Sequence, residues 1–158
     1  MRVERTEDVE FISSVLRHPD IADLVSDDGE VKLPIHPELY YLVPKIEIGV
    51  EPGIIEERAI GCLAFAPVNY VTWNPHAAIL PQYRGRGTEA MRLGIQWMRE
   101  NTRCRKLVAN VPEYNARMIR VFQKCKFQHE GFSPGSALKR DVLYGRVLMG
   151  RGIDDADA

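Results

Sequence analysis

The spacing of apolar residues changes several times along the chain, and each change marks a predicted element. Residues 2–5 fit a short first strand, and residues 9–17 place their apolar side chains on one helical face. Thr6 stands at the expected N-cap of that helix. A second, shorter helix is predicted around residues 21–25, after a His-Pro-Asp break.

Residues 39–80 change to the period of strands. They contain short β-branched or apolar runs, over residues 40–43, 46–50, 59–67 and 71–80. A Glu-Pro-Gly sequence between the second and third runs is typical of a turn. The arrangement predicts an antiparallel meander.

Beyond residue 80, strands alternate with two amphipathic helices. The helices are predicted over residues 88–101 and 115–124, with apolar residues on one face and polar residues on the other. Strands are predicted over residues 106–111, 127–132 and 142–148. The resulting order, β-α-α-β-β-β-α-β-α-β-β, predicts an α/β (α+β) fold.

Composition narrows the class of protein. The chain has 158 residues, of which 45% are apolar, so we expect one domain over residues 1–149 and a flexible acidic tail over 150–158. The formal net charge of −1 does not favour nucleic acid or an anionic membrane as a partner. There is no apolar run of membrane-spanning length, and three cysteines without CxxC spacing fit a reducing cytoplasm. The histidines lack metal-ligand spacing, so no metal is expected.

Residues 77–88 carry the most informative pattern. An apolar strand ends at a proline and is followed by a basic, glycine-rich turn that opens directly into a helix. Gly85 and Gly87 allow tight backbone conformations, and the first N–H groups of the helix have no intrahelical partners. Arg84 and Arg86 add positive charge. Together these features predict a site for a diphosphate.

Two other nucleotide-binding patterns fit this loop poorly. A Walker loop requires a lysine before Ser or Thr, and none is present at this turn. A Rossmann turn belongs after the first parallel strand, whereas this loop follows a predicted antiparallel meander in mid-chain.

The segment Gln82-Tyr-Arg-Gly-Arg-Gly87 matches the Gln/Arg-x-x-Gly-x-Gly/Ala signature of the GNAT (Gcn5-related N-acetyltransferase) superfamily. Asn115, which opens the last predicted helix, and the Lys126-Phe127 pair that follows that helix resemble a second family landmark. The motifs cover residues 59–148, and the element order extends the resemblance over the whole chain.

The resemblance implies the GNAT fold and acetyl-CoA as cofactor. The implied fold has a central, mixed, mostly antiparallel sheet of six to seven strands flanked by about four helices, with a splayed strand pair that forms the CoA wedge. The residues implied to contact the cofactor are Ile79, Leu80, Gln82, Tyr83, Arg84, Gly85, Arg86, Gly87, Thr88, Asn115 and Phe122. Within this set, the amides of residues 84–88 are implied to hold the pyrophosphate, and Ile79 and Leu80 to pair with the pantetheine arm.

The catalytic residues depart from the family pattern. GNAT enzymes commonly have a proton-donating tyrosine where this chain has Phe122, and a glycine where it has Lys126. Tyr114 is the candidate substitute acid, with a packing role as the alternative. His76 is the candidate base or proton relay, with an exposed turn histidine after Asn-Pro as the alternative.

The expected function is acetyl-CoA-dependent transfer of an acetyl group to a primary amine, by direct attack of that amine. The acceptor is a small molecule or a peptide. Acidic residues between 20 and 28 either attract a cationic amine or form a solvated turn, and the basic residues of helix 115–124 are read as a solvated helix surface. The alternative is a weakly active or inactive GNAT-fold protein with a structural or assembly role, similar to compact proteins of tailed phages. A homodimer is compatible with the sequence.

Overall fold

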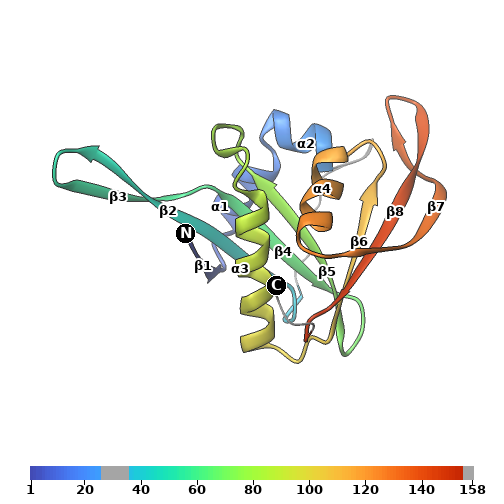
Figure 1. Cartoon of the computed structure of the whole chain (residues 1–158). Helices are drawn as coiled ribbons and strands as arrows, with labels where there is room; N and C mark the ends of the chain where they lie inside the picture. Colours follow the sequence, from blue (N-terminus) through green and yellow to red (C-terminus); the bar gives the residue numbers. More distant parts are fainter. Residues whose placement is uncertain (26–35, 155–158) are drawn as a thin grey trace.

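The computed structural model describes residues 1–25 and 36–154, whose arrangement is shown in Figure 1. This part of the chain contains eight strands, four α-helices and one 3-10 helix: β1 (Arg2–Thr6), α1 (Val9–Leu16), α2 (Pro19–Val25), β2 (Tyr40–Glu51), β3 (Ile54–Ala59), β4 (Gly61–Pro67), β5 (Thr72–Ile79), η1 (Pro81–Tyr83), α3 (Gly87–Asn101), β6 (Lys106–Pro112), α4 (Ala116–Lys124), β7 (Gln128–Lys139) and β8 (Val142–Gly152).

All described strands belong to one open sheet with the order β1-β2-β4-β5-β6-β8-β7, and β3 pairs with β2 beside this path. Every pairing is antiparallel except that between β5 and β6, which is parallel. The predicted α+β architecture with a mixed, mostly antiparallel sheet is therefore confirmed. None of the helices in the described residues has the length and apolar composition needed to cross a bilayer.

One observed strand was not predicted from the sequence, and another was predicted as two separate strands. Tyr40–Glu51 forms a single strand, because Pro44 sits inside β2 without interrupting its register with β1. Ile54–Ala59, which has little apolar alternation, pairs with the outer half of β2 as a projecting hairpin (Figure 1). The first helix also starts differently: Asp8, not Thr6, accepts the capping hydrogen bond from the Phe11 N–H.

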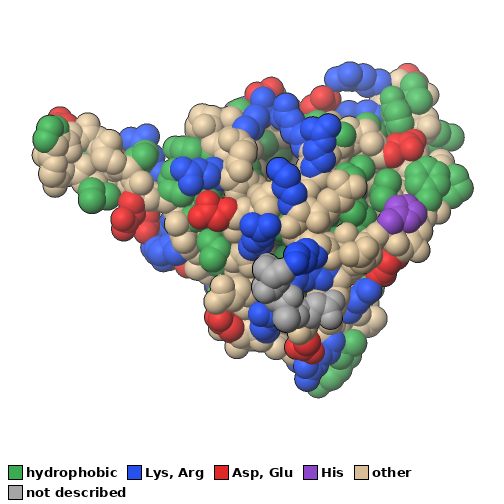
Figure 2. Space-filling view, viewed as in Figure 1, with side chains coloured by type: hydrophobic (Ala, Val, Ile, Leu, Met, Phe, Trp, Pro, Cys, Tyr) green, Lys and Arg blue, Asp and Glu red, His purple; other side chains and the backbone are tan. Residues whose placement is uncertain are grey.

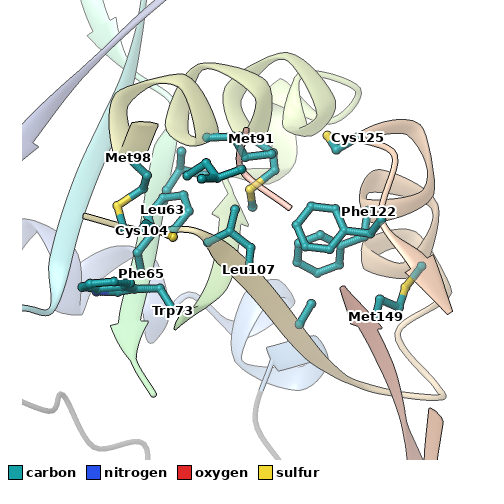
Figure 3. Packing of buried hydrophobic residues seen from close by; sticks show 14 of the residues in the cluster. Leu63, Phe65, Trp73, Met91, Met98, Cys104, Leu107, Phe122, Cys125 and Met149 are labelled. Atoms are coloured by element: carbon teal, nitrogen blue, oxygen red, sulfur yellow. The ribbon is translucent and has the colours of Figure 1, made fainter. Parts of the chain in front are cut away.

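The main core lies between the sheet and the helices α3 and α4. Figure 3 shows Met91 and Met98 of α3 directed toward Leu63, Phe65 and other residues of the sheet. Gly94 allows this close approach, since an added Cβ would lie 2.7 Å from Leu63 Cδ1. A smaller cluster on the opposite face joins α1 and α2 to β4 and β5. The central part of the sheet is thus covered on both faces, by α3 and α4 on one face and by α1 and α2 on the other.

The start of the flexible tail was predicted too early in the chain. The expected boundary between residues 149 and 150 falls inside β8, which continues to Gly152. Arg151 is only 5% exposed and Ile153 is fully buried. The packed domain therefore extends at least to Ile153, and the last four residues of the expected tail lie outside the described residues.

Candidate functional site

Strands β5 and β6 pair over only two residues and then separate. Their parallel register consists of Thr72 with Lys106 and Trp73 with Leu107, although β5 continues to Ile79 and β6 to Pro112. The two strands diverge toward the ends of α2 and α4 (Figure 1). This splay confirms the predicted wedge in the sheet.

The hydrogen bonds of β5 indicate which main-chain groups face the gap. The Val68 N–H donates to the Thr72 carbonyl, and the Leu80 N–H donates to the Ile60 carbonyl, both at 2.9 Å. In an antiparallel ladder the polar groups of alternate residues point to the same neighbour. Even-numbered residues of β5 therefore bond to β4, and the N–H groups of Ala77 and Ile79 point into the gap.

Pro75 explains why pairing with β6 stops where it does. By the same alternation, its nitrogen faces β6, two residues after the last paired residue, Trp73. Proline has no N–H to donate, so it interrupts a ladder on the side that it faces. The register with β4 continues across it, with Phe65 opposite Pro75. The Asn-Pro sequence is thus part of a strand and not the turn considered from the sequence.

A groove of about 430 Å³ extends from this gap to the start of α3. Its walls come from α2, the end of β5, the turn before α3, and α4. The lining residues are Asp20, Ile21, Leu24, Ala77, Ala78, Ile79, Arg84, Gly85, Gly87, Thr88, Asn115, Arg117, Met118, Arg120, Val121 and Lys124. Segments far apart in sequence therefore form one continuous surface.

The glycine-rich turn presents main-chain donors to one end of the groove. The N–H groups of Arg84 and Arg86 are used within the turn, by the carbonyls of Pro81 and Tyr83. Those of Gly85, Gly87, Thr88 and Glu89 have no acceptor among the described residues. Gly85 has φ +98 and open space where a Cβ would be, so the turn both needs glycine and leaves room for a ligand.

Positive charge gathers at the same end. Arg84, Arg117, Arg120 and Lys124 line the groove, with Asp20 the single acidic residue among the lining set. Figure 2 shows Lys and Arg side chains over the adjoining ends of α3 and α4. The unpaired N–H groups add the positive end of the α3 dipole. This end of the groove is suited to phosphate groups.

His76 lies in the middle of β5 rather than just before it. Its side chain is on the face opposite α3, because Ala77 packs in the α3 cluster and Ala78 in the α1–α2 cluster. The residue keeps exposed surface, although protein groups crowd the ring. Desolvation by the surrounding protein, with a smaller effect of Arg146, lowers the pKa of His76 below its ordinary value. A neutral imidazole is therefore favoured, as a base requires.

The other two candidates for catalysis or binding on α4 and the loop before it differ in position. Tyr114 stands edge-on to Tyr144, with ring centroids 5.1 Å apart, and lines a hollow next to the groove together with Arg84 and Asn115. Phe122 is 1% exposed and packs against Phe127. A phenyl ring has no polar tip to keep near solvent, so it turns into the core and does not line the groove.

Asn115 holds two elements together at the edge of the groove. Its Oδ1 accepts a hydrogen bond from the Met118 N–H, which caps α4, and its Nδ2 donates to the Leu24 carbonyl of α2 at 3.2 Å. The side chain is 7% exposed and still lines the groove. Its main role in the described structure is to fix α2 against α4.

The sequence identified part of the groove and missed part. Of the residues expected to contact a cofactor, six line it: Ile79, Arg84, Gly85, Gly87, Thr88 and Asn115. Leu80, Gln82, Tyr83, Arg86 and Phe122 do not. Arg117, Arg120 and Lys124, read from the sequence as a solvated helix surface, border the groove instead. These three basic residues recur at helical spacing on α4, the first helix after the splayed strand β6. That spacing was the sequence signal that could have placed them at the groove.

The buried cysteines are poorly suited to act as nucleophiles at the groove. Burial raises the pKa of the Cys62 thiol to about 12 and that of the Cys104 thiol to about 11. Such thiols stay protonated and are poor nucleophiles. Cys125 is also buried, with its Sγ 3.7 Å from the Thr88 carbonyl.

Solved structures share the fold over nearly the whole chain. A proposed phosphinothricin N-acetyltransferase is 18% identical, with a TM-score of 0.70 and coverage of 97% of this chain and 98% of its own. The spermidine N-acetyltransferase from Vibrio cholerae, in complex with CoA and spermine, is 14% identical, with a TM-score of 0.73 and coverage of 95% and 94%. At these identities the likeness concerns the fold.

A third structure and a family model complete the comparison. The proposed acetyltransferase yncA from Salmonella typhimurium, with acetyl-CoA, is 21% identical, with a TM-score of 0.58 and coverage of 76% and 68%. No curated protein sequence matches the chain. The model of the acetyltransferase (GNAT) family matches residues 16–127, which is most of the chain and includes the glycine-rich turn, so this protein belongs to the GNAT acetyltransferase family.

Proposed function

We propose that this protein is an acetyl-CoA-dependent N-acetyltransferase whose acceptor is a primary amine. The observation that carries the proposal is one groove in which the unpaired N–H groups at the start of α3 and the unpaired edge of β5 lie end to end. The first can bind a diphosphate, and the second can pair with the amides of an extended chain. CoA contains both parts, in that order.

The fit of the cofactor rests on main-chain groups that have no partner in the described part of the chain. The N–H groups of Gly85, Gly87, Thr88 and Glu89 would receive the pyrophosphate, with Arg84 beside them. Ala77 and Ile79 would pair with the pantetheine arm. Leu80, also expected in this role, already donates its N–H to Ile60. The basic residues of α4 would neutralise further phosphate charge.

Acetyl-CoA supplies the acetyl group as a thioester: the amine nitrogen forms the new C–N bond, the C–S bond breaks, and its electron pair leaves on sulfur. The N–H of Ala77, which lies farther than Ile79 from the phosphate end of the groove, is the proposed donor to the thioester carbonyl oxygen as it gains negative charge, while the Ala77 carbonyl and Ile79 pair with the arm. His76, whose pKa is lowered by desolvation and by Arg146, is the proposed acceptor of the amine proton.

Tyr114 is our proposed donor of a proton to the departing thiolate. Its position beside Asn115, at the hollow shared with Arg84, supports this role. A thiol with a pKa near that of cysteine, about 8.5, leaves without much assistance. The demand on this residue is therefore smaller than the demand on the base.

The test combines binding with turnover. Acetyl-CoA binding is measured by calorimetry and thiol release by a colorimetric assay with a panel of amines. His76→Gln should lower kcat/KM for the amine by about 100-fold, the usual contribution of a positioned base, and leave acetyl-CoA affinity unchanged. Tyr114→Phe should have a smaller effect, confined to kcat. Absence of acetyl-CoA binding, or binding without turnover of any amine, would contradict the proposal.

A further inference from the structure

The face of the sheet turned away from α3 carries polar residues that the groove does not use. Trp73, Ala77 and Ile79 pack in the cluster beneath α3, whereas Ala78 and Leu80 pack with α1 and α2. Alternation along a strand then puts Asn74 and His76 on the α1–α2 face. They lie two residues apart on β5, beside the gap between β5 and β6 into which the acetyl group would extend.

Asn74 has an unmet requirement on this face. Its Oδ1 is buried and has no hydrogen-bond partner among residues 1–25 and 36–154. A buried carbonyl oxygen without a donor costs free energy, about 1–3 kcal/mol, and such groups are rare in folded proteins. An N–H or O–H donor of a bound molecule would satisfy it. Because His76 is the next residue on the same face, an amine that meets Asn74 also lies close to the proposed base.

Arg146 of β8 reaches the same region from the other side of the gap. Its neighbours Val147 and Met149 pack in the α3–α4 cluster, so alternation places Arg146 on the face of Asn74 and His76. After desolvation, the positive charge of Arg146 is the second cause of the lowered pKa of His76. The two side chains are therefore close enough to interact electrostatically. The Nε of Arg146 donates to the Ser136 carbonyl at 3.1 Å, and this contact anchors the guanidinium within the β7–β8 hairpin.

Two acidic groups on the surrounding walls, Asp23 and Glu113, are already engaged. Asp23 of α2 forms ion pairs with Lys139 and Arg140 of the β7–β8 hairpin, at 3.4 Å and 3.1 Å. Glu113, at the end of β6, accepts a hydrogen bond from the Gly145 N–H at 2.9 Å. Within the described residues, these two carboxylates are therefore poorly placed to recognise a polycation. Among the described residues, Arg146 is the charged side chain that acts on the His76 ring, and Asp27 and Asp28 lie outside the described residues.

We propose that the acceptor is a dipolar molecule of the amino-acid type, with its amine received by Asn74 and His76 and its anionic group bound by Arg146. This inference rests on the proposed function and specifies its substrate class. An arginine fork suits a carboxylate or a phosphinate, because both present paired oxygens. A polyamine has no group for Arg146 and is repelled by it.

The decisive assay compares acceptors that differ only in the anionic group. Thiol release is measured with the standard L-amino acids, phosphinothricin and spermidine, and with the α-carboxamide of each amino acid that is a substrate. We expect at least one amino acid to exceed its carboxamide and spermidine in kcat/KM by about 10-fold or more, because a site built for a charged group rejects an analogue lacking it.

Variants then locate the two ends of the acceptor. Arg146→Gln should raise KM for the amino acid by about 10-fold or more, with a change below about 2-fold for the carboxamide. Asn74→Leu, of similar volume, should raise KM for both, since both contain the amine. Arg105→Gln is the matched control: Arg105 is exposed, pairs with Asp154 and lies at the opposite end of β6. It should change none of these values.

The outcomes separate this inference from the function on which it rests. If wild-type protein does not bind acetyl-CoA, the proposed function is wrong. If it binds acetyl-CoA but prefers spermidine or the carboxamides, or acetylates no amino acid, only the dipolar acceptor is wrong. An equal loss for acid and carboxamide in Arg146→Gln would also overturn it. Unchanged acetyl-CoA affinity shows that a variant is folded, and Arg146→Lys, which keeps the charge without the fork, should give an intermediate KM.

Discussion

Phe122 packs its ring against Phe127, with centroids 4.7 Å apart and planes inclined by 53°. Phe122 stands where the family pattern leads one to expect a tyrosine, yet its side chain is 1% exposed and belongs to the core beneath α3. A hydroxyl added to this ring would enter an apolar cluster and would not reach the groove.

We therefore expect Phe122→Tyr to lower the free energy of unfolding by about 1–3 kcal/mol, the cost of a buried hydroxyl without a partner. The turnover number should not increase. Urea denaturation and the thiol-release assay measure the two quantities. Phe11→Tyr, on a half-buried ring of α1 that water reaches, should cost less. A faster enzyme of unchanged stability would show that residue 122 does reach the acetyl group.

Gly85 allows a direct test of the proposed phosphate site, because the chain offers a matched control. Gly85→Glu puts a carboxylate beside the unpaired N–H groups, where it would repel the pyrophosphate. We expect acetyl-CoA affinity to fall by about 100-fold, roughly the coupling energy of close charges in a partly desolvated site. Calorimetric titration of each variant gives the two dissociation constants.

Gly53→Glu is the control. Gly53 has φ +79 and, like Gly85, nothing within 4 Å of an added Cβ, but it lies in the turn between β2 and β3. Both variants carry a similar backbone cost, about 1–2 kcal/mol for a left-handed residue. Gly53→Glu should therefore lose stability but keep its affinity for acetyl-CoA. Equal affinities in the two variants would refute the placement of the phosphates.

Much of the fold follows from local pattern. The helices α3 and α4 bury one apolar face each, and their periods gave bounds within one residue of those observed. The glycine-rich turn was found because its signal is also local: φ +98 at Gly85 requires glycine. By contrast, Ile54–Ala59 was missed because every residue from Ile54 to Arg58 is exposed, so no buried face imposes alternation on the strand.

The groove was harder to predict because it depends on neighbours distant in sequence. Arg117, Arg120 and Lys124 lie on the polar face of α4, and helical periodicity cannot distinguish a face turned to solvent from one turned to a groove. The roles of Leu80 and Ile79 depend on which strand each faces, and that became clear only from the Leu80–Ile60 hydrogen bond. Similarly, the Asn-Pro sequence at 74–75 is typical of a turn, but here both residues pair with β4 and continue the strand.

Pro75 provides a test of how the wedge is maintained. Pro75→Ala restores an N–H directed toward β6, which would let pairing extend beyond Trp73 and narrow the groove. We expect acetyl-CoA affinity to fall by about 3- to 10-fold, the equivalent of one added hydrogen bond that the ligand must displace. Pro67→Ala, at the end of β4, controls for the loss of proline rigidity in the unfolded chain. Unchanged affinity in Pro75→Ala would assign the splay to another cause.

Lys126 occupies the position after α4 that usually belongs to glycine. Its φ is +65, and the Lys126 and Phe127 N–H groups donate to the carbonyls of Gln123 and Phe122, both at 3.0 Å, as in a Schellman motif. Lys126→Gly removes the left-handed strain and should raise the free energy of unfolding by about 0.5–1 kcal/mol. In a domain of this size that corresponds to about 1–4 °C in Tm.

The neighbouring lysine gives the opposite sign. Lys124 is the last residue of α4, and Lys124→Gly should destabilise the protein by up to about 1 kcal/mol because glycine is a poor helix former. The Tm of both variants is measured by thermal unfolding. A rise in Lys126→Gly with a fall in Lys124→Gly distinguishes relief of backbone strain at residue 126 from a tolerance of glycine at any position near the end of α4. Loss of stability in Lys126→Gly would contradict the assignment of strain to its backbone.

The charge near the proposed acceptor site can be measured through the titration of His76. Desolvation and, to a smaller extent, Arg146 hold the pKa of His76 below 6.5, because both disfavour the protonated ring. The base form is therefore present at neutral pH, and kcat/KM should lose the contribution of His76 only as the pH falls through that lowered pKa. We expect NMR titration of the ring to give a midpoint below 6.5 in the wild type and a higher one in Arg146→Gln, with no change in Arg105→Gln. If the midpoint does not move when Arg146 loses its charge, the two residues do not share a site, and Arg146 does not face the proposed acceptor.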